Sequence, residues 1–583
     1  MTENDMKNNN IDKRPHYVLT AIGVNPQKTP YSLGSKNEKG NFSTPALIKL
    51  LPETPSKIFL LLTEKAKGNK EKFKEDINGN KIEITEIEIP DGKTNGEIED
   101  ILKKILENIP ENCDLTLDIT NGLRHFPFLF FTSALYLQSL KNIHIKGVYY
   151  GALELRNSGI VPFIDLGIIL EMVEWFYAAR LFAEEKNANK LYSMIVNNKN
   201  NKQDKSNKNF FEKIKKFNIS YSTTLILEMG DAIKSFVNQL DNKKSKIEKN
   251  ESIPLLPELL EYISKSIKKF KLDNEIKTTG DWKSKYQLTE KELNRQISII
   301  DSYIETGHYI NAIELMREWI VSRCIWFKNE KVDKWLTKKT RKDVEQQLGS
   351  INWQNEQKIL QEDKKELAEL WNDLTQVRNS MAHCEMNEEK IEKDLETKIR
   401  SIWSKIKDKN EINGFWNPYI ISSGGKLLVT PVGMSKGLLY TALSKISPDV
   451  CIIITSKDAE NGIEEAIREA SYKGDIKKII MKDPFAGVTE IKDIKSNFLT
   501  PKYSEYRELI QEAKEIVVNL TGGTTMMQIL VDDISKVANK MGKDIKKVIT
   551  IDRRDVMEQK KEPFMIGEVL PYKPSDEKNC KEY

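Results

Sequence analysis

Short apolar runs separated by helical patterns characterise the first part of the chain, about residues 14–170. The runs at residues 17–22, 58–62, 115–118 and 143–150 are typical of buried strands. Helical periodicity fills the stretches between them, most clearly at 96–108 and 127–140. Strands that alternate with helices predict a parallel, doubly wound α/β sheet.

The same texture returns at about residues 424–572, where apolar runs occupy 426–430, 451–455, 515–520 and 548–552. The two outer regions therefore look like divergent copies of one architecture. Between them, about residues 168–410 are almost continuously helical in pattern and contain few Gly or Pro residues. Two polar segments of low complexity, 197–209 and 241–252, interrupt this region, and we expect them to be loops or insertions with solvated lysines.

Length and composition bound the number and class of domains. At about 100 to 200 residues per domain, 583 residues make three to four domains. We place them at 14–168, 169–412 and 424–572, an α/β, an all-α and an α/β region. Apolar residues make up 39% and charged residues 31%, a soluble globular composition. The net charge of +4, from 91 basic and 87 acidic residues, does not favour a protein that coats nucleic acid, although a local basic patch would be compatible with it.

Cysteine and histidine spacing gives no indication of a metal site. The five cysteines contain no C-x-x-C pair, and the five histidines form no H-E-x-x-H pattern. No run of 18 apolar residues occurs, and the N-terminus is polar. We therefore expect no metal, no membrane partner and a cytoplasmic protein.

Residues 367–385 (LAELWNDLTQVRNSMAHCE) combine an apolar stripe with polar chemistry. Leu367, Trp371, Leu374 and Met381 fall on one helical face. The stem of Arg378 leaves from this same stripe, and a cation there is costly unless it is paired or lines a cleft.

Arg378 and His383 are suited to RNA cleavage without a metal. A histidine can accept or donate the proton of a 2′-hydroxyl, and an arginine fork can hold the anionic phosphorane. Five residues turn through about 500° on a helix, so one copy makes a splayed site. Two copies across a twofold axis could close a cluster of two Arg378, two His383 and two Asn379. The alternative is a helix C-terminus that is capped by basic residues.

Residues 118–127 (DITNGLRHFP) form a polar turn between a predicted strand and a helix. Open α/β sheets bind ligands at such turns, and backbone N–H groups at a helix N-terminus suit phosphate. An ordinary strand-to-helix turn is the alternative.

The segment 378–383 (RNSMAH) matches the R-x-x-x-x-H motif of HEPN ribonucleases, including the polar Asn379 after the arginine. Residues 307–319 look like the packing helix of that fold, with Ala312, Met316, Trp319 and Arg323 at helical spacing.

Both outer regions resemble CRISPR-associated Rossmann-fold (CARF) domains. The motifs 20–23 (TAIG), 31–34 (YSLG), 60–64 (LLLTE), 118–124 (DITNGLR) and 147–154 (GVYYGALE) follow the order of one CARF branch. That branch usually has His where this chain has Asn121. At the other end, 430–436 (TPVGMSK) and 517–527 (VVNLTGGTTMM) look like a first-strand loop and a ligand turn. The fold expected is two Rossmann-like CARF domains that flank a helical HEPN domain.

The resemblance implies an ancillary ribonuclease of type III CRISPR antiviral defence. Such proteins are homodimers that bind a cyclic oligoadenylate in the CARF pair and then cut single-stranded RNA in the HEPN cleft. The ligand is made by the type III effector complex, to which no stable binding is expected. The resemblance makes Arg378, His383 and Asn379 catalytic. It implies a first ligand site of Thr20, Gly23, Asn25, Ser32, Asn121, Gly122, Arg124 and His125, and a second of Gly433, Ser435, Lys436, Thr521, Gly522, Gly523, Thr524 and Thr525.

Three questions stay open at this point. The second CARF region either degrades the activator, with Lys436 and Ser435 orienting a 2′-hydroxyl attack, or only braces the dimer or binds the ligand. The chain is either a ribonuclease or a catalytically silent receptor that recruits a partner; a transcription factor is disfavoured because no helix-turn-helix pattern occurs. The resemblance favours cyclic tetra-adenylate as activator, with cyclic hexa-adenylate next.

Overall fold

The computed structural model describes residues 14–77, 82–197, 205–247, 255–273, 280–329, 332–382, 395–420 and 422–572. The chain divides into two compact units, one of residues 1–218 with 236–267 and one of 219–235 with 268–583. Each unit is considered by itself below.

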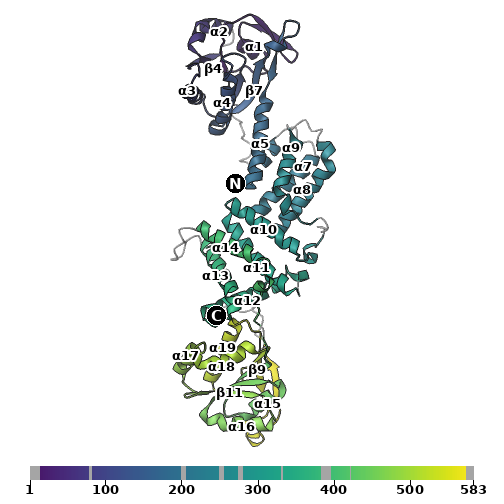
Figure 1. Cartoon of the computed structure of the whole chain (residues 1–583), viewed down its shortest axis with the longest axis vertical. Helices are drawn as coiled ribbons and strands as arrows, with labels where there is room; N and C mark the ends of the chain where they lie inside the picture. Colours follow the sequence, from purple (N-terminus) through teal and green to yellow (C-terminus); the bar gives the residue numbers. More distant parts are fainter. Residues whose placement is uncertain are drawn as a thin grey trace, which may run out of the picture. The chain divides into compact units, whose positions relative to one another are not determined.

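The first unit contains a mixed eight-stranded sheet in the order β3-β2-β8-β7-β6-β1-β4-β5 (Figure 1). Its strands are β1 (His16–Ala21), β2 (Thr29–Leu33), β3 (Lys36–Gly40), β4 (Lys57–Leu62), β5 (Glu83–Glu88), β6 (Asp114–Asp118), β7 (His144–Gly151) and β8 (Val161–Asp165). The helices packed on it are α1 (Ser43–Leu50), α2 (Lys70–Ile77), α3 (Asn95–Asn108) and α4 (Phe126–Lys141).

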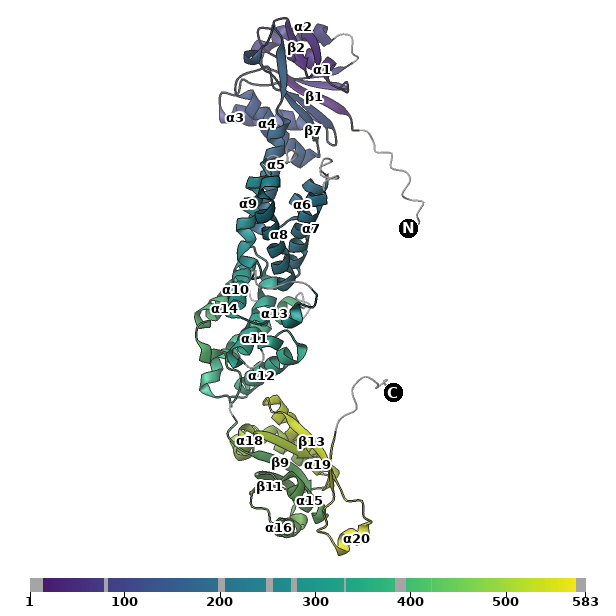
Figure 2. The same ribbon diagram turned by 90° about the vertical axis from the view of Figure 1, so that its right-hand side faces the viewer.

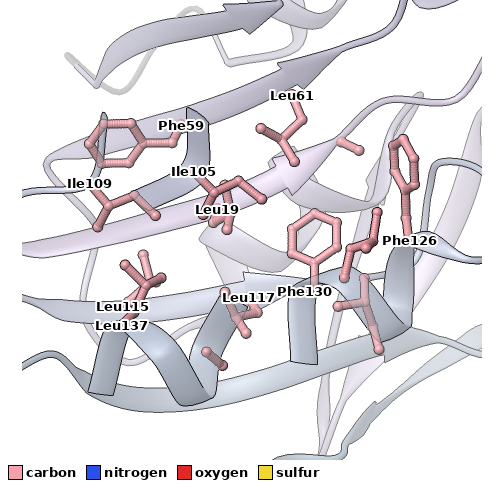
Figure 3. Packing of buried hydrophobic residues seen from close by; sticks show 14 of the residues in the cluster. Leu19, Phe59, Leu61, Ile105, Ile109, Leu115, Leu117, Phe126, Phe130 and Leu137 are labelled. Carbon is pink, nitrogen blue, oxygen red and sulfur yellow. The ribbon is translucent and has the colours of Figure 1, made fainter. Parts of the chain in front are cut away.

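Alternate strand residues face two different helical layers. On one face Leu19, Phe59 and Leu117 pack against Ile105 of α3 and Phe130 of α4 (Figure 3). On the other face a separate cluster joins β1 and β4 to α1 and α2, with members that include Val18, Leu60, Ile48 and Phe73. The sheet is therefore buried on both sides, as continuous apolar strands require.

The second sheet repeats this plan with six strands in the order β11-β10-β9-β12-β13-β14 (Figure 2). The strands are β9 (Lys426–Val432), β10 (Val450–Ser456), β11 (Asp475–Met481), β12 (Glu515–Asn519), β13 (Ile545–Ile551) and β14 (Glu568–Pro571). One core contains α17 (Val488–Asn497), α18 (Ser504–Glu512) and α19 (Thr525–Lys540), and the other contains α15 (Lys436–Ile446) and α16 (Glu460–Glu469). A short helix, α20 (Val556–Lys561), follows β13.

The strands that the apolar runs predict are confirmed in both sheets, but a purely parallel sheet was wrong. β8 is antiparallel to β7, β2 and β3 form an antiparallel pair, and β14 is antiparallel to β13. These strands lie at or near the edges, where one or both faces meet water. Short, polar sequences such as that of β3 therefore give no apolar run.

The part of the chain between β8 and β9 in sequence is helical. Its helices are α5 (Gly167–Glu185), α6 (Asn189–Asn197), α7 (Lys205–Ser222), α8 (Ile226–Ile247), α9 (Leu256–Ile267), α10 (Glu290–Glu305), α11 (Tyr309–Lys328), α12 (Lys338–Glu356), α13 (Glu362–Ala382) and α14 (Leu395–Lys409). The expected loops at 197–209 and 241–252 were partly wrong, because α7 begins at Lys205 and α8 extends to Ile247. Lysine and glutamate are good helix formers, so a polar composition does not by itself end a helix. The remainder of both segments lies outside the described residues, apart from Asn197, which ends α6.

A buried ion pair anchors the start of α10. The guanidinium of Arg295 donates to Glu292 twice, from Nε and Nη2, at 2.7 Å each. Tyr286 and Gln296 also donate to Glu292, and Arg295 Nη1 donates to the carbonyls of Ile226 and Phe270 at 3.1 Å. Each charge is thus satisfied by more than its ion partner, as a buried pair needs.

Replacing Arg295 with Met should destabilise the second unit by about 3 to 5 kcal/mol, because Glu292 would stay buried without its cation. Urea unfolding followed by tryptophan fluorescence measures this, since the Trp335 indole donates to the carbonyl of Tyr286 in the same network. The control is Arg180→Met, which breaks an exposed pair with Glu184 and should leave the unfolding curve unchanged. Equal curves for the two variants would contradict the importance of the buried pair.

Candidate functional site

Both sheets have a switch point at a central strand. In the first, β4 and β5 lie on one side of β1, and β6 and β7 lie on the other. In the second, the chain passes from β9 to β10 and β11 and then returns to β12 and β13. The carboxyl ends of β1 and β6, and of β9 and β12, are therefore the positions where open α/β sheets bind ligands.

A buried carboxylate organises the first switch point. Asp118 ends β6 and accepts hydrogen bonds from the hydroxyls of Ser43 and Thr44, both at 2.7 Å, and from the backbone N–H of Thr120 at 3.0 Å. These donors stabilise a charge that is fully buried. The carboxylate thereby fixes the N-terminus of α1 beside the turn that follows β6.

The predicted residues Gly23, Asn121 and Gly122 come together at this turn. Asn121 Nδ2 donates to Ser43 Oγ at 2.7 Å, and a Cβ on Gly23 would lie 3.5 Å from Asn121 Oδ1. Gly122 has φ +113°, and a Cβ there would lie 2.7 Å from the ring of Phe126. Only glycine fits this position without strain.

The other residues predicted for the first site lie in varied surroundings. Thr20 is fully buried, and its hydroxyl forms a hydrogen bond with that of Thr44 at 2.8 Å. It therefore belongs to the buried polar groups beneath the turn rather than to its surface. Asn25 and Arg124 are exposed on the loops after β1 and β6. His125 bonds the carbonyl of Asp91 at 2.9 Å through Nε2. Ser32 lies on β2, which β8 and β7 separate from β6, and it is not among the groups that Asp118 gathers.

A buried amide occupies the equivalent place in the second sheet. Asn519 ends β12, and its Nδ2 donates to Thr430 Oγ1 at 3.0 Å and to the carbonyl of Thr521 at 2.9 Å. Its Oδ1 accepts from the N–H of Thr521 and from Thr550 Oγ1, both at 3.2 Å. This side chain ties β12 to both neighbouring strands.

The two turns share a threonine bond and a glycine of positive φ, but the glycine comes two residues after Thr120 in the first turn and directly after Thr521 in the second. Gly522 has φ +113°, the value of Gly122. Thr120 Oγ1 accepts from the N–H of Gly151 at 2.8 Å, and Thr521 Oγ1 accepts from the N–H of Thr550 at 3.1 Å. The turns differ in the residue that ends the strand, which is charged in the first sheet and neutral in the second.

The remaining predicted residues of the second site lie on the loop after β9, at the start of α15 and in the segment that leads into α19. A Cβ on Gly433 would lie 2.9 Å from Gly523 Cα, so the loop after β9 touches the turn. Thr524 Oγ1 accepts from the N–H of Met527 and caps α19. Lys436 pairs with Glu465, and its ammonium lies 5.4 Å from the centre of the Phe564 ring. Ser435 and Thr525 are exposed.

The helical region presents Arg378 near the end of α13, which packs against α11 (Figures 1 and 2). Leu374 and Val377 are buried, whereas 38% of the Arg378 side chain is exposed. Its Nε donates to Glu314 Oε1 of α11 at 3.0 Å, so the cation on the apolar stripe is paired. Asn379 is exposed. The described part of α13 ends at Ala382, and His383 lies outside the described residues.

The face of α11 singled out in the sequence forms the core of this region. Ala312, Met316 and Trp319 are fully buried, and Arg323 is buried among them. Arg323 Nη2 donates to the carbonyl of Asn410 and to Asn413 Oδ1, and burial lowers the pKa of this guanidinium. Arg323 therefore has a structural role.

Four residues that organise these places were not predicted as site residues. Asp118, Ser43 and Thr44 support the first turn from within, and Glu314 holds Arg378. Asp118 stands inside the predicted motif, but nothing in a single sequence pairs it with residues 75 positions earlier. Glu314 has a weak signal, as one of two carboxylates in a helix rich in apolar residues.

Among the described residues, no group of three or more His, Cys, Asp or Glu is placed to hold a metal ion. The helices in the described ranges are all too short or too polar to cross a membrane.

Comparison with known proteins concerns mainly the first sheet. Residues 17–154 match the family model described as CRISPR system endoribonuclease Csx1, CARF domain. The CRISPR-associated protein MJ1674 of Methanocaldococcus jannaschii is 25% identical over 146 residues, which are 25% of this chain and 22% of that protein. The chain thus covers less than a quarter of that relative's length.

A solved structure described as a type III CRISPR defence DNA nuclease activated by cyclic oligoadenylate covers 92% of this chain, which in turn covers 65% of that chain. The identity is 10% and the TM-score 0.16, so this likeness supports no statement about fold or activity. Residues 17–154, which contain the strands β1 to β7 and the helices α1 to α4, are a CARF-like domain that matches the CARF model of the Csx1 family.

Proposed function

We propose that the chain is an endoribonuclease of type III CRISPR antiviral defence, activated by a cyclic oligoadenylate and independent of metal ions. The observation that carries this proposal is the match of residues 17–154 to the CARF domain of an endoribonuclease family. The R-x-x-x-x-H segment at 378–383 supplies the chemistry. In this proposal the domains are 14–168, 169–412 and 424–572, and two copies of the chain share the ribonuclease site.

The construction of the first turn supports binding of an oligoadenylate. Phosphates are bound well by backbone N–H groups at a helix N-terminus, and the turn at Asn121 and Gly122 leads directly into α4. Arg124 is exposed beside it and adds a positive charge. Of the two candidate rings, cyclic tetra-adenylate is proposed first and cyclic hexa-adenylate second.

The proposed reaction is attack of an RNA 2′-hydroxyl on the adjacent phosphate. His383 moves the proton, Arg378 holds the charge that develops on the phosphorane, and Asn379 orients the phosphate. Five residues turn through about 500° on an ideal helix, so one copy of the Arg378 and His383 pair makes a splayed site, and we propose that a second copy completes it.

The second sheet is proposed to be a second CARF domain. Its support is internal: the turn after β12 repeats the buried polar anchor, the threonine bond and the φ of +113° found after β6. We propose that the first turn receives the activator and that the second turn degrades it slowly, with Lys436 stabilising the attacked phosphate.

Replacing Arg378 or His383 with Ala should lower RNA cleavage at least about 100-fold, because each removes a group that acts in the transition state. The measurement uses a fluorogenic single-stranded RNA, cyclic tetra-adenylate or hexa-adenylate, and EDTA. Binding of the activator, measured by calorimetry, should be unchanged in both variants. Cleavage that persists in either variant would contradict the site, and a wild-type chain that binds activator without cutting RNA would favour a silent receptor.

Replacing Gly122 with Ala should abolish activation, because the new Cβ would meet the ring of Phe126 and distort the phosphate-binding turn. Gly522→Ala places the same strain in the second turn and should leave activation within about twofold. Gly159→Ala is the matched control, since Gly159 also has a positive φ but has open space around it. Loss of activation in Gly522→Ala alone would reverse the assignment of the two turns.

Replacing Lys436 with Ala in the full chain should slow the loss of labelled cyclic tetra-adenylate at least about tenfold. The Gly522→Ala chain should lose this activity too, whereas Gly122→Ala should retain it. Chromatography of the labelled ring over several hours measures the rate. An activator that stays intact with the wild-type chain would leave the second turn as a binding or bracing element only.

A further inference from the structure

Glu314 is in contact with the guanidinium of Arg378 across two packed helices. Its Oε1 accepts from Arg378 Nε at 3.0 Å, and each side chain is 38% exposed. Glu314 belongs to α11 and Arg378 to α13, so the pair depends on the packing between these helices. The R-x-x-x-x-H motif at 378–383 contains Arg378 but does not indicate a partner on another helix.

The contact uses one atom of the guanidinium and leaves the others available. Within the described ranges, Arg378 Nη1 and Nη2 make no hydrogen bond. A guanidinium presents its two Nη atoms as an edge that fits two oxygens of a phosphate. A carboxylate on Nε therefore fixes the plane of the fork while this edge stays free.

The other charged side chains near Glu314 on α11 form ion pairs with residues other than Arg378. Arg317 pairs with Glu318 and Glu345 and lies over the ring of Trp371. Glu318 pairs with Arg341 as well. In the described structure, Glu314 is thus the carboxylate that holds Arg378.

An ion pair this exposed contributes little to folding, since water screens it. The ion pair instead restricts the orientation of the arginine side chain. A long side chain at a helix surface otherwise samples many rotamers, and each alternative rotamer lowers the fraction of molecules in which the arginine is ready to react. The same carboxylate also repels an anionic substrate, so it has an opposite effect on binding.

We propose that Glu314 is a positioning residue that orients Arg378 toward the scissile phosphate of RNA and weakens RNA binding through its charge. This inference rests on the ribonuclease proposed above. In this proposal the hydrogen bond at Nε raises kcat and the negative charge of Glu314 raises KM. Substitutions that remove only the charge, or both the charge and the hydrogen bond, can separate these two effects.

Two substitutions separate them in the full chain. Glu314→Gln keeps an oxygen that accepts from Nε but removes the charge, so kcat should stay within about twofold and KM should fall about twofold. Glu314→Ala removes both, so kcat should fall about tenfold while KM falls as in the Gln variant. The difference in KM should shrink in 0.5 M salt, because salt screens the charge and not the hydrogen bond.

Glu318→Gln and Glu318→Ala are the matched controls, because Glu318 lies one turn further along α11 and pairs with other arginines. Neither should change kcat by more than about twofold. Cleavage of the fluorogenic RNA with saturating activator is the assay, and thermal unfolding confirms that all variants are folded.

The outcomes are distinct. If Arg378→Ala is inactive but Glu314→Ala has the kcat of the wild type, the positioning role is overturned. If Glu314→Ala cuts RNA faster without activator, the carboxylate is a lock and the proposal is equally overturned. If the wild-type chain cuts no RNA, or Arg378→Ala cuts as fast as the wild type, the proposed function fails first and this inference fails with it.

Discussion

One buried polar side chain at the end of a central strand shapes the turn that follows that strand in each sheet. Asp118 and Asn519 occupy this position in the two sheets and each bonds the N–H of the threonine two residues later. That bond bends the chain sharply away from the strand. A glycine two residues after this threonine in the first sheet, and one residue after it in the second, takes a φ of +113°, and the helix then begins at the carboxyl end of the strands.

The difference between a carboxylate and an amide changes what each turn depends on. A carboxylate only accepts, so Asp118 needs donors, and Ser43 and Thr44 supply them from α1. An amide both donates and accepts, so Asn519 is satisfied by Thr430 and Thr550 of the adjacent strands. The first turn is therefore coupled to α1, whereas the second is held within its own sheet. This contrast agrees with the proposed division of roles between the two turns.

The interior strands and most helices were predictable because burial on two faces produces continuous apolar runs with clear ends. The edge strands β3 and β14 were not, because an edge strand is paired on one side only and needs no such run. The same logic applies to the sites. Gly122 and Gly522 were predictable because a strand followed by a Gly-containing polar turn is a local signal. Glu314 was not, because its partner is 64 residues away and only the packing of α11 on α13 brings them together.

This limit has a physical cause that also bears on function. Local patterns reveal the groups that react, since those need particular residue types at fixed spacing along one helix or turn. The groups that orient them come from other elements and have only to reach the right atom, so many sequences satisfy the requirement. Asp118 and Glu314 meet this requirement in two different ways. Asp118 is a fully buried carboxylate that accepts from three donors, and Glu314 is a half-exposed carboxylate that accepts from one. The buried arrangement is rigid, because breaking it would leave a charge without water. The half-exposed arrangement can be remade at small cost, which suits the role proposed for Arg378, in which the guanidinium exchanges solvent for a phosphate in each catalytic cycle.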